Sequence, residues 1–176
     1  MIVTQENFTK IINIMDTQKV LFIDTETNGL EPYLGNRICG VGIGLSSGKT
    51  YYFPFRHLYP NSSNLSQSQL IALMDVLNKA KIIIGYNIKF DLHMLMMEGF
   101  IPWDKDLIDV LVGVRLIEKE RFPVLGLSPT IERIFGPGSA NYDLETKNIL
   151  KKQKWIKNFA LAPIDILGPY CEEDVK

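Results

Sequence analysis

The sequence predicts an α/β fold with a mixed five-stranded sheet flanked by helices. Three features indicate it: three strand-like segments lie between residues 19 and 54, a well-capped helix follows them, and a strand, a helix and another strand then alternate. With 176 residues and 46% hydrophobic content, the chain suits a single domain with its own core, and a disordered protein is excluded.

Turn residues and apolar runs define the elements of the first third of the chain. A short helix is expected over residues 5–15, and strands are expected over residues 19–25, 37–45 and 50–54. Asn28 and Gly29 form one turn signal, and the segment from Ser46 to Gly48 forms another. The three strands should therefore form a meander.

The end signals of the next segment predict a helix over residues 67–79. Ser66 and Gln69 match a capping box, and Leu65 and Leu70 occupy the hydrophobic-staple positions. Beyond it we expect a strand over residues 81–85, a helix over 88–99 and a fifth strand over 107–110. The segment from Pro137 to Asp143 is interpreted as a loop inside the domain.

The composition narrows the class of protein. No apolar stretch approaches the ~20 residues that span a membrane, and the N-terminus lacks a basic-then-apolar signal. We therefore expect a soluble, cytoplasmic, monomeric protein with no membrane partner. Cys39 and Cys171 are too few for a disulfide framework and match no zinc pattern. His57 and His93 are interpreted as ordinary surface or packing residues.

Asp24 and Glu26 are the most informative residues of the chain. They follow an apolar run, Val20 to Ile23, and lie two apart, so both project from one face of a strand. Two carboxylates so close repel each other unless a pKa rises or a cation lies between them. A solvated strand end is the alternative, but the apolar run favours a buried strand, and buried carboxylates need partners.

Two further segments carry acidic residues. Asp91 comes four residues after Asn87, at the start of the helix that follows the strand over residues 82–84. Alone, it can equally be a residue that favours a helix N-terminus electrostatically. Tyr170 and Asp174 are also four apart and share a helix face, where a phenol can orient or deprotonate a water beside a metal-bound carboxylate.

In this order and spacing, the three segments resemble the Exo I, Exo II and Exo III motifs of the DEDD superfamily of 3′-5′ exonucleases. The resemblance runs from about Val20 to Asp174 and is greatest to the proofreading domain of A-family (Pol I-like) DNA polymerases. The segments Trp103–Ile117 and Leu125–Gly136 resemble two intervening blocks of that group, with Asp109 at the aspartate of the first. The resemblance implies a ribonuclease H-like (DnaQ-like) fold.

The residue pattern also indicates the subclass and the chemistry. The histidine subclass places its histidine where this chain has Pro169, whereas Tyr170 and Asp174 match the tyrosine subclass. The resemblance implies hydrolysis of 3′-terminal phosphodiester bonds by two divalent cations, Mg²⁺ or Mn²⁺. The implied metal ligands are Asp24, Glu26, Asp91 and Asp174, with Asp24 bridging both ions and Asp91 acting through water. Tyr170 would orient the attacking water with help from Glu26.

By motif position, three more residues would contact a single-stranded or frayed 3′ end of DNA. These are the backbone of Thr27, the side chain of Leu30 as an apolar wedge under the terminal base, and Asn87. Capping of the helix that carries Asp91 is the alternative role for Asn87. No element is expected to read base edges, so digestion should not depend on sequence.

Two features depart from the family pattern. Pro169 precedes Tyr170 where a helix interior is normal, so either the helix kinks or Gly168 breaks it and a new helix starts at Pro169. The sequence also ends two residues after Asp174, which leaves little to hold that helix.

The charge distribution gives one further signal. A net charge of −1 does not indicate a nucleic-acid binder, although bound cations can supply positive charge. Five lysines lie around Trp155 in the segment Lys147–Lys157. They can track a single strand while the indole stacks on a base, or they can form the solvated face of a helix that buries the tryptophan.

Residues 1–176 are thus expected to form one 3′-5′ exonuclease domain, the N-terminal part of a longer polymerase. Met1, directly ahead of the domain, suggests a phage-type parent without a preceding 5′-nuclease module, with the polymerase domain in cis. An exoribonuclease of the RNase D type is one alternative, and a catalytically silent nucleic-acid-binding domain is another.

Overall fold

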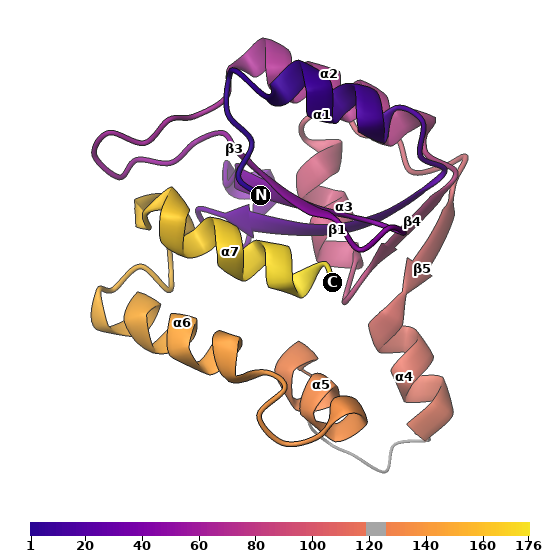
Figure 1. The fold of residues 1–176 in the computed structure, drawn as a ribbon, viewed down its shortest axis with the longest axis vertical. Helices are drawn as coiled ribbons and strands as arrows, with labels where there is room; N and C mark the ends of the chain where they lie inside the picture. Colours follow the sequence, from indigo (N-terminus) through magenta and orange to yellow (C-terminus); the bar gives the residue numbers. More distant parts are fainter. Residues whose placement is uncertain (119–125) are drawn as a thin grey trace.

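The computed structural model describes residues 1–118 and 126–176 and contains one five-stranded sheet (Figure 1). The strand order is β3-β2-β1-β4-β5, in which β1 pairs antiparallel with β2 and parallel with β4. The predicted mixed sheet is therefore confirmed. The strands are β1 (Val20–Thr27), β2 (Ile38–Leu45), β3 (Thr50–Pro54), β4 (Ile82–Gly85) and β5 (Asp106–Asp109).

The helices cover both faces of the sheet. Figure 1 shows α1 and α2 together on one face, and α7 across the other with α6 outside it. The 3-10 turns are Pro32–Leu34 and Phe159–Leu161. The α-helices are α1 (Phe8–Met15), α2 (Gln67–Lys79), α3 (Lys89–Met96), α4 (Val110–Glu118), α5 (Leu127–Phe135), α6 (Asn141–Lys152) and α7 (Ile164–Asp174).

The predicted elements agree with the observed ones except at some ends. The capping box of α2 forms as expected, and α2 and β3 have the predicted bounds. The segment 137–143 was expected to be a loop, but α6 already begins at Asn141. Leu125, the first residue of one family-like block, lies outside the described residues. Among those residues, no helix is long and apolar enough to cross a membrane.

Strand β1 separates the core from the site. Leu21 and Ile23 are buried in the main hydrophobic core, together with residues of α1 and α2. Because side chains alternate between the two faces of the sheet along a strand, Asp24 and Glu26 point to the opposite face, toward α7. The strand runs two residues beyond the predicted end at residue 25, so Glu26 lies within the strand, on the same face as Asp24.

Glycines in β2 let α7 lie close to this face of the sheet. Gly42 pairs with Asp24, and a Cβ atom on Gly42 would lie 2.6 Å from the sulfur of Cys171 and 3.0 Å from its carbonyl oxygen. A Cβ atom on Gly44 would lie 2.4 Å from the carbonyl oxygen of Val175. Glycine in a strand often marks such a close approach. The alternate glycines therefore fix how deeply α7 is seated.

Helix α7 runs through Pro169 as one helix, so of the two alternatives the break at Gly168 does not occur. The proline ring is exposed, whereas Leu167, Tyr170 and Cys171 are buried against the sheet. Packing of these side chains holds the helix although Pro169 removes one backbone donor from it.

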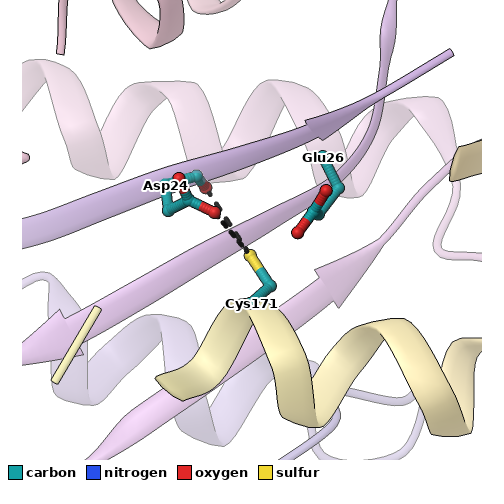
Figure 2. A group of neighbouring side chains, drawn as sticks. All are labelled: Asp24, Glu26 and Cys171. Atoms are coloured by element: carbon teal, nitrogen blue, oxygen red, sulfur yellow. Dashed lines mark hydrogen bonds between the residues drawn. The ribbon is translucent and has the colours of Figure 1, made fainter. Parts of the chain in front are cut away.

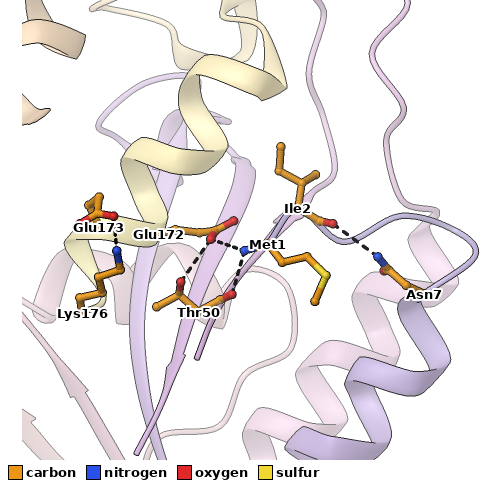
Figure 3. A network of polar contacts seen from close by, with 7 residues as sticks. All are labelled: Met1, Ile2, Asn7, Thr50, Glu172, Glu173 and Lys176. Atoms are coloured by element: carbon orange, nitrogen blue, oxygen red, sulfur yellow. Dashed lines mark hydrogen bonds and ion pairs between the residues drawn. The ribbon is translucent and has the colours of Figure 1, made fainter. Parts of the chain in front are cut away.

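The C-terminal end of α7 is also anchored by polar contacts (Figure 3). The carboxylate of Glu172 pairs with the amino group of Met1 and accepts a hydrogen bond of 3.2 Å from the Thr50 hydroxyl. Lys176 pairs with Glu173. The expectation that little holds this helix near Asp174 is therefore not met.

Candidate active site

All four predicted carboxylates line one cavity of about 220 Å³ at the C-terminal end of β1. Strand β1 supplies Asp24 and Glu26, α3 supplies Asp91, and α7 supplies Asp174. Tyr170 and Asn87 line the same cavity. Residues far apart in sequence thus meet at one opening, as the motif pattern predicts for a cation site.

The Asp24–Glu26 pair lies beside a cysteine that the sequence did not mark as part of the site. Figure 2 shows Cys171 of α7 facing both carboxylates of β1. Its sulfur donates to Asp24 Oδ2 at 3.3 Å, and one ligand atom from each of the three residues lies within 4.8 Å of the others. Glu26 is only 3% exposed, so its carboxylate lies almost entirely out of water.

Asp91 lies on helix α3 and is held in place by hydrogen bonds from strand β1. Its Oδ1 accepts hydrogen bonds from the backbone N–H of Thr25 at 2.8 Å and from the Thr25 hydroxyl at 2.6 Å. Thr25 lies between Asp24 and Glu26, so these bonds tie α3 directly to the acidic segment of β1. They fix the Asp91 carboxylate at the edge of the cavity.

Two residues of α6 complete the site, and sequence reasoning missed both. The hydroxyl of Tyr142 donates to Asp174 Oδ1 at 2.7 Å, and the hydroxyl of Tyr170 donates to Asp143 Oδ1 at 3.0 Å. Asp143 also pairs with Lys147 at 2.7 Å. Both missed residues fall in or beside the segment interpreted as a loop, and no local pattern links them to α7.

The cavity is electrostatically unfavourable without a cation. Burial raises the pKa values of Asp24 and Glu26 well above their usual range, and repulsion from Asp174 raises both further. Burial likewise raises the pKa of Asp91 to about 7 and that of Asp174 to about 6. Oxygen donors that share an excess of negative charge fit hard divalent cations such as Mg²⁺ and Mn²⁺.

The three predicted substrate-contacting residues differ in exposure, and of them Asn87 lines the cavity. Leu30 is 77% exposed, as a wedge for a base would need to be, whereas Thr27 is buried and its hydroxyl donates to the carbonyl of Gly29. Asn87 is exposed in a left-handed conformation, with φ of 56°. Its backbone N–H donates to Asp109 Oδ1 at 2.9 Å, and α3 has no side-chain cap, so the capping role is not seen.

Residues outside the acidic cluster have other roles. His57 is buried and bonds the hydroxyl of Tyr52 and the carbonyl of Ala162, as expected for a packing residue. In the lysine-rich segment, α6 ends at Lys152, and Trp155 is half-buried with its ring edge toward Tyr59. Trp155 therefore lies beyond the end of α6, so the alternative of one lysine-faced helix that buries Trp155 is met only as far as Lys152.

The raised carboxylate pKa values predict how stability depends on pH. Between about pH 4 and pH 7 the folded, metal-free protein binds more protons than the unfolded chain, so its stability should fall as the pH rises. We expect the Tm without metal to be higher at pH 5.5 than at pH 8 by on the order of 5 °C. At pH 8, adding Mg²⁺ or Mn²⁺ should raise the Tm again. Calorimetry in EDTA checks this, and a Tm that rises steadily from pH 5.5 to pH 8 would contradict it.

The comparisons with known proteins show the family of this chain. The chain matches a family model described as 3′-5′ exonuclease over residues 1–176. It is 38% identical over 77 residues to the DNA polymerase DpoZ of Acinetobacter phage SH-Ab 15497, and 36% identical over 96 residues to that of Salmonella phage PMBT28. These matches cover 44% and 54% of this chain but only 11% and 12% of the polymerases.

A solved structure supports the fold. The RNase domain of the yeast Pop2 protein superposes with a TM-score of 0.56 at 13% identity, covering 79% of this chain and 77% of that one. At this identity the likeness concerns the ribonuclease H-like architecture alone. With the family matched over the whole length, the chain belongs to the 3′-5′ exonuclease family found in A-family DNA polymerases.

Proposed function

We propose that this chain removes nucleotides from single-stranded or frayed 3′ ends of DNA, as the proofreading domain of a phage-type polymerase in the host cytoplasm. The observation that carries the proposal is the convergence of four carboxylates and Tyr170 on one cavity, in a chain of the 3′-5′ exonuclease family. The phage DNA polymerases among its relatives favour DNA as substrate and a polymerase domain in the parent protein.

Two divalent cations, Mg²⁺ or Mn²⁺, would be held by Asp24, Glu26, Asp91 and Asp174. When bound, they supply Lewis-acid stabilisation of the phosphate oxygens and lower the pKa of a water. The bonds from Thr25 and Tyr142 orient two of these carboxylates before substrate arrives. Preorganised ligands avoid rearrangement during the reaction.

Tyr170 fits the role of orienting the attacking water. Burial, together with the charges of Asp174 and Glu26, raises the pKa of its phenol above the ordinary value, so the hydroxyl keeps its proton. The hydroxyl donates a hydrogen bond to Asp143, which leaves its oxygen free to accept a hydrogen bond from water. This favours orientation of the water over its deprotonation, in keeping with the tyrosine subclass.

Asp143 should act by positioning Tyr170. Replacing Asp143 by Ala removes the acceptor of the phenol, and we expect the exonuclease rate to fall about 10- to 100-fold with little change in KM for the oligonucleotide. Glu145→Ala, at an exposed position of the same helix, should leave the rate unchanged. Steady-state kinetics on both variants checks this. A larger effect of Asp143→Ala on KM than on kcat would oppose the positioning role.

Matched DNA and RNA oligonucleotides test the substrate class. We expect the DNA to be shortened with Mg²⁺ or Mn²⁺ and not with EDTA, and the RNA to be digested more slowly because 2′-hydroxyl groups change the contacts at the terminal nucleotide. Faster digestion of RNA would favour an exoribonuclease of the RNase D type. Digestion of neither by the folded protein would favour a silent nucleic-acid-binding domain.

A further inference from the structure

Cys171 gives the acidic cluster a donor of different chemistry. Its sulfur lies 3.3 Å from Asp24 Oδ2, and one carboxylate oxygen of Glu26 completes a group within 4.8 Å (Figure 2). Two ligand atoms of one tetrahedral zinc ion lie about 3.3–3.6 Å apart, given bond lengths of about 2.0–2.3 Å. The sulfur–oxygen pair already has this spacing, and a carboxylate oxygen of Glu26 lies within 4.8 Å of both atoms.

Glu26, which the proposed function also assigns to a cation, is a buried carboxylate aimed into the cavity. It is only 3% exposed, lines the cavity, and has no hydrogen bond to any residue that the structure describes. The positive charge of Lys147 is near enough to favour its ionised form, but Lys147 pairs with Asp143 instead. A buried carboxylate in this situation is stabilised by a cation.

The position of the thiol is set by rigid elements. Cys171 is fully buried in α7, and Gly42 of β2 lies directly beneath it, so its sulfur occupies space that any larger residue at position 42 would fill. A strand supplies the two carboxylates and a helix supplies the sulfur, which is the kind of support that keeps a ligand set in place.

We propose that Asp24, Glu26 and Cys171 form a binding site for a thiophilic divalent cation such as Zn²⁺ or Cd²⁺. Thiolate sulfur selects such ions over Mg²⁺, which prefers oxygen ligands. On binding, the sulfur–metal bond forms as the thiol releases its proton to solvent, and the ion then faces two carboxylates and one thiolate. A zinc ion held by these three ligands would have a fourth position left for water.

This site shares two carboxylates with the proposed catalytic site, so one consequence rests on the proposed function. An ion held by Cys171 would occupy Asp24 and Glu26 in a geometry unlike the octahedral one that Mg²⁺ requires. Zn²⁺ should therefore inhibit digestion supported by Mg²⁺, and the inhibition should be weaker in Cys171→Ser. Binding itself can be measured without any nuclease activity.

A cadmium titration of the metal-free, reduced protein tests the site. The ultraviolet absorption of a cadmium–thiolate bond should appear at one ion per chain in the wild type and in Cys39→Ser, a matched control with the other buried free cysteine. Cys171→Ser should lose the absorption, and Asp24→Asn should bind the ion at least about 10-fold more weakly. Thermal unfolding of each variant establishes that it is folded.

Three results would overturn the proposal: no absorption in the wild type, absorption that survives in Cys171→Ser, or full affinity in Asp24→Asn. None of them depends on whether the chain digests DNA. Conversely, a wild-type protein that binds Cd²⁺ through Cys171 but cleaves no oligonucleotide with Mg²⁺ would support this site and contradict the proposed function.

Discussion

Replacing Asp24 by Asn is expected to lower exonuclease activity by at least about 1,000-fold while stabilising the metal-free protein. Burial raises the pKa values of Asp24 and Glu26, repulsion from Asp91 and Asp174 raises that of Asp24 further, and repulsion from Asp24 raises that of Glu26. Removing its charge relieves that repulsion but leaves the cations without their central ligand, and each 10-fold in rate corresponds to about 1.4 kcal/mol. At pH 8 in EDTA the Tm of the variant should exceed that of the wild type.

The change in Tm on adding a divalent cation distinguishes the loss of a cation ligand from a simple loss of folding. Mg²⁺ or Mn²⁺ should raise the Tm of the wild type and leave that of Asp24→Asn nearly unchanged. Asp75→Asn, at an exposed position of α2, is the matched control and should behave as the wild type does. Retained cleavage in Asp24→Asn, or a lower Tm without metal, would show that the carboxylate is not the centre of a cation site.

Replacing Gly42 by Ala is expected to displace α7 and thereby lower exonuclease activity, although Gly42 lies on β2 and outside the acidic cluster. The new Cβ atom would lie 2.6 Å from the sulfur of Cys171 and 3.0 Å from its backbone oxygen, so the helix must move outward. Overpacking of this kind costs about 1–3 kcal/mol of the free energy of unfolding. Because Tyr170 and Asp174 lie on the same helix, a shift of about 1 Å should lower kcat about 100-fold.

A glycine in open surroundings provides the control for this substitution. A Cβ atom added to Gly113 in α4 would meet no atom of the described residues outside its own helix within 4 Å. Gly113→Ala should therefore leave activity intact and stabilise its helix by about 0.5–1 kcal/mol. Denaturant unfolding and single-turnover kinetics on both variants make the comparison. Wild-type activity in Gly42→Ala would mean that the close seating of α7 is not needed.

The elements that local signals define were predicted well. The capping box at Ser66 and Gln69 gives α2 its observed start, and the order of strands and helices gives the mixed sheet. The carboxylates that meet in the cavity were also found from sequence, because each lies at the end of a recognisable strand or on a helix face. The spacing of residues within each segment puts each carboxylate on the correct face of its strand or helix, and the fold brings the three segments together at the cavity.

The contacts that were missed all join segments distant in sequence. Tyr142 and Asp143 reach α7 from a helix whose first turn follows Gly136 and Gly138, two glycines with positive φ, and these punctuate the segment as a loop. The approach of Cys171 to Asp24 depends on the glycines of β2, whose alternation was a visible but unused sign of close packing.

The continuity of α7 was missed for a related reason. The preference of proline against helix interiors is a local cost, whereas the burial of Leu167, Tyr170 and Cys171 is a tertiary gain that opposes it. The exposed side of Pro169 shows why the ring is tolerated there. Local propensity alone therefore left a break at Gly168 open as an alternative.

Digestion of a 5′-labelled DNA primer with a mismatched 3′ end tests the central claim most directly. With Mn²⁺ or Mg²⁺, the account predicts a ladder of labelled products that shortens one nucleotide at a time from the 3′ end, and no products with EDTA or in Asp24→Asn. Release of the label as a mononucleotide, or an intact primer after incubation with the folded wild-type protein and cation, would contradict it.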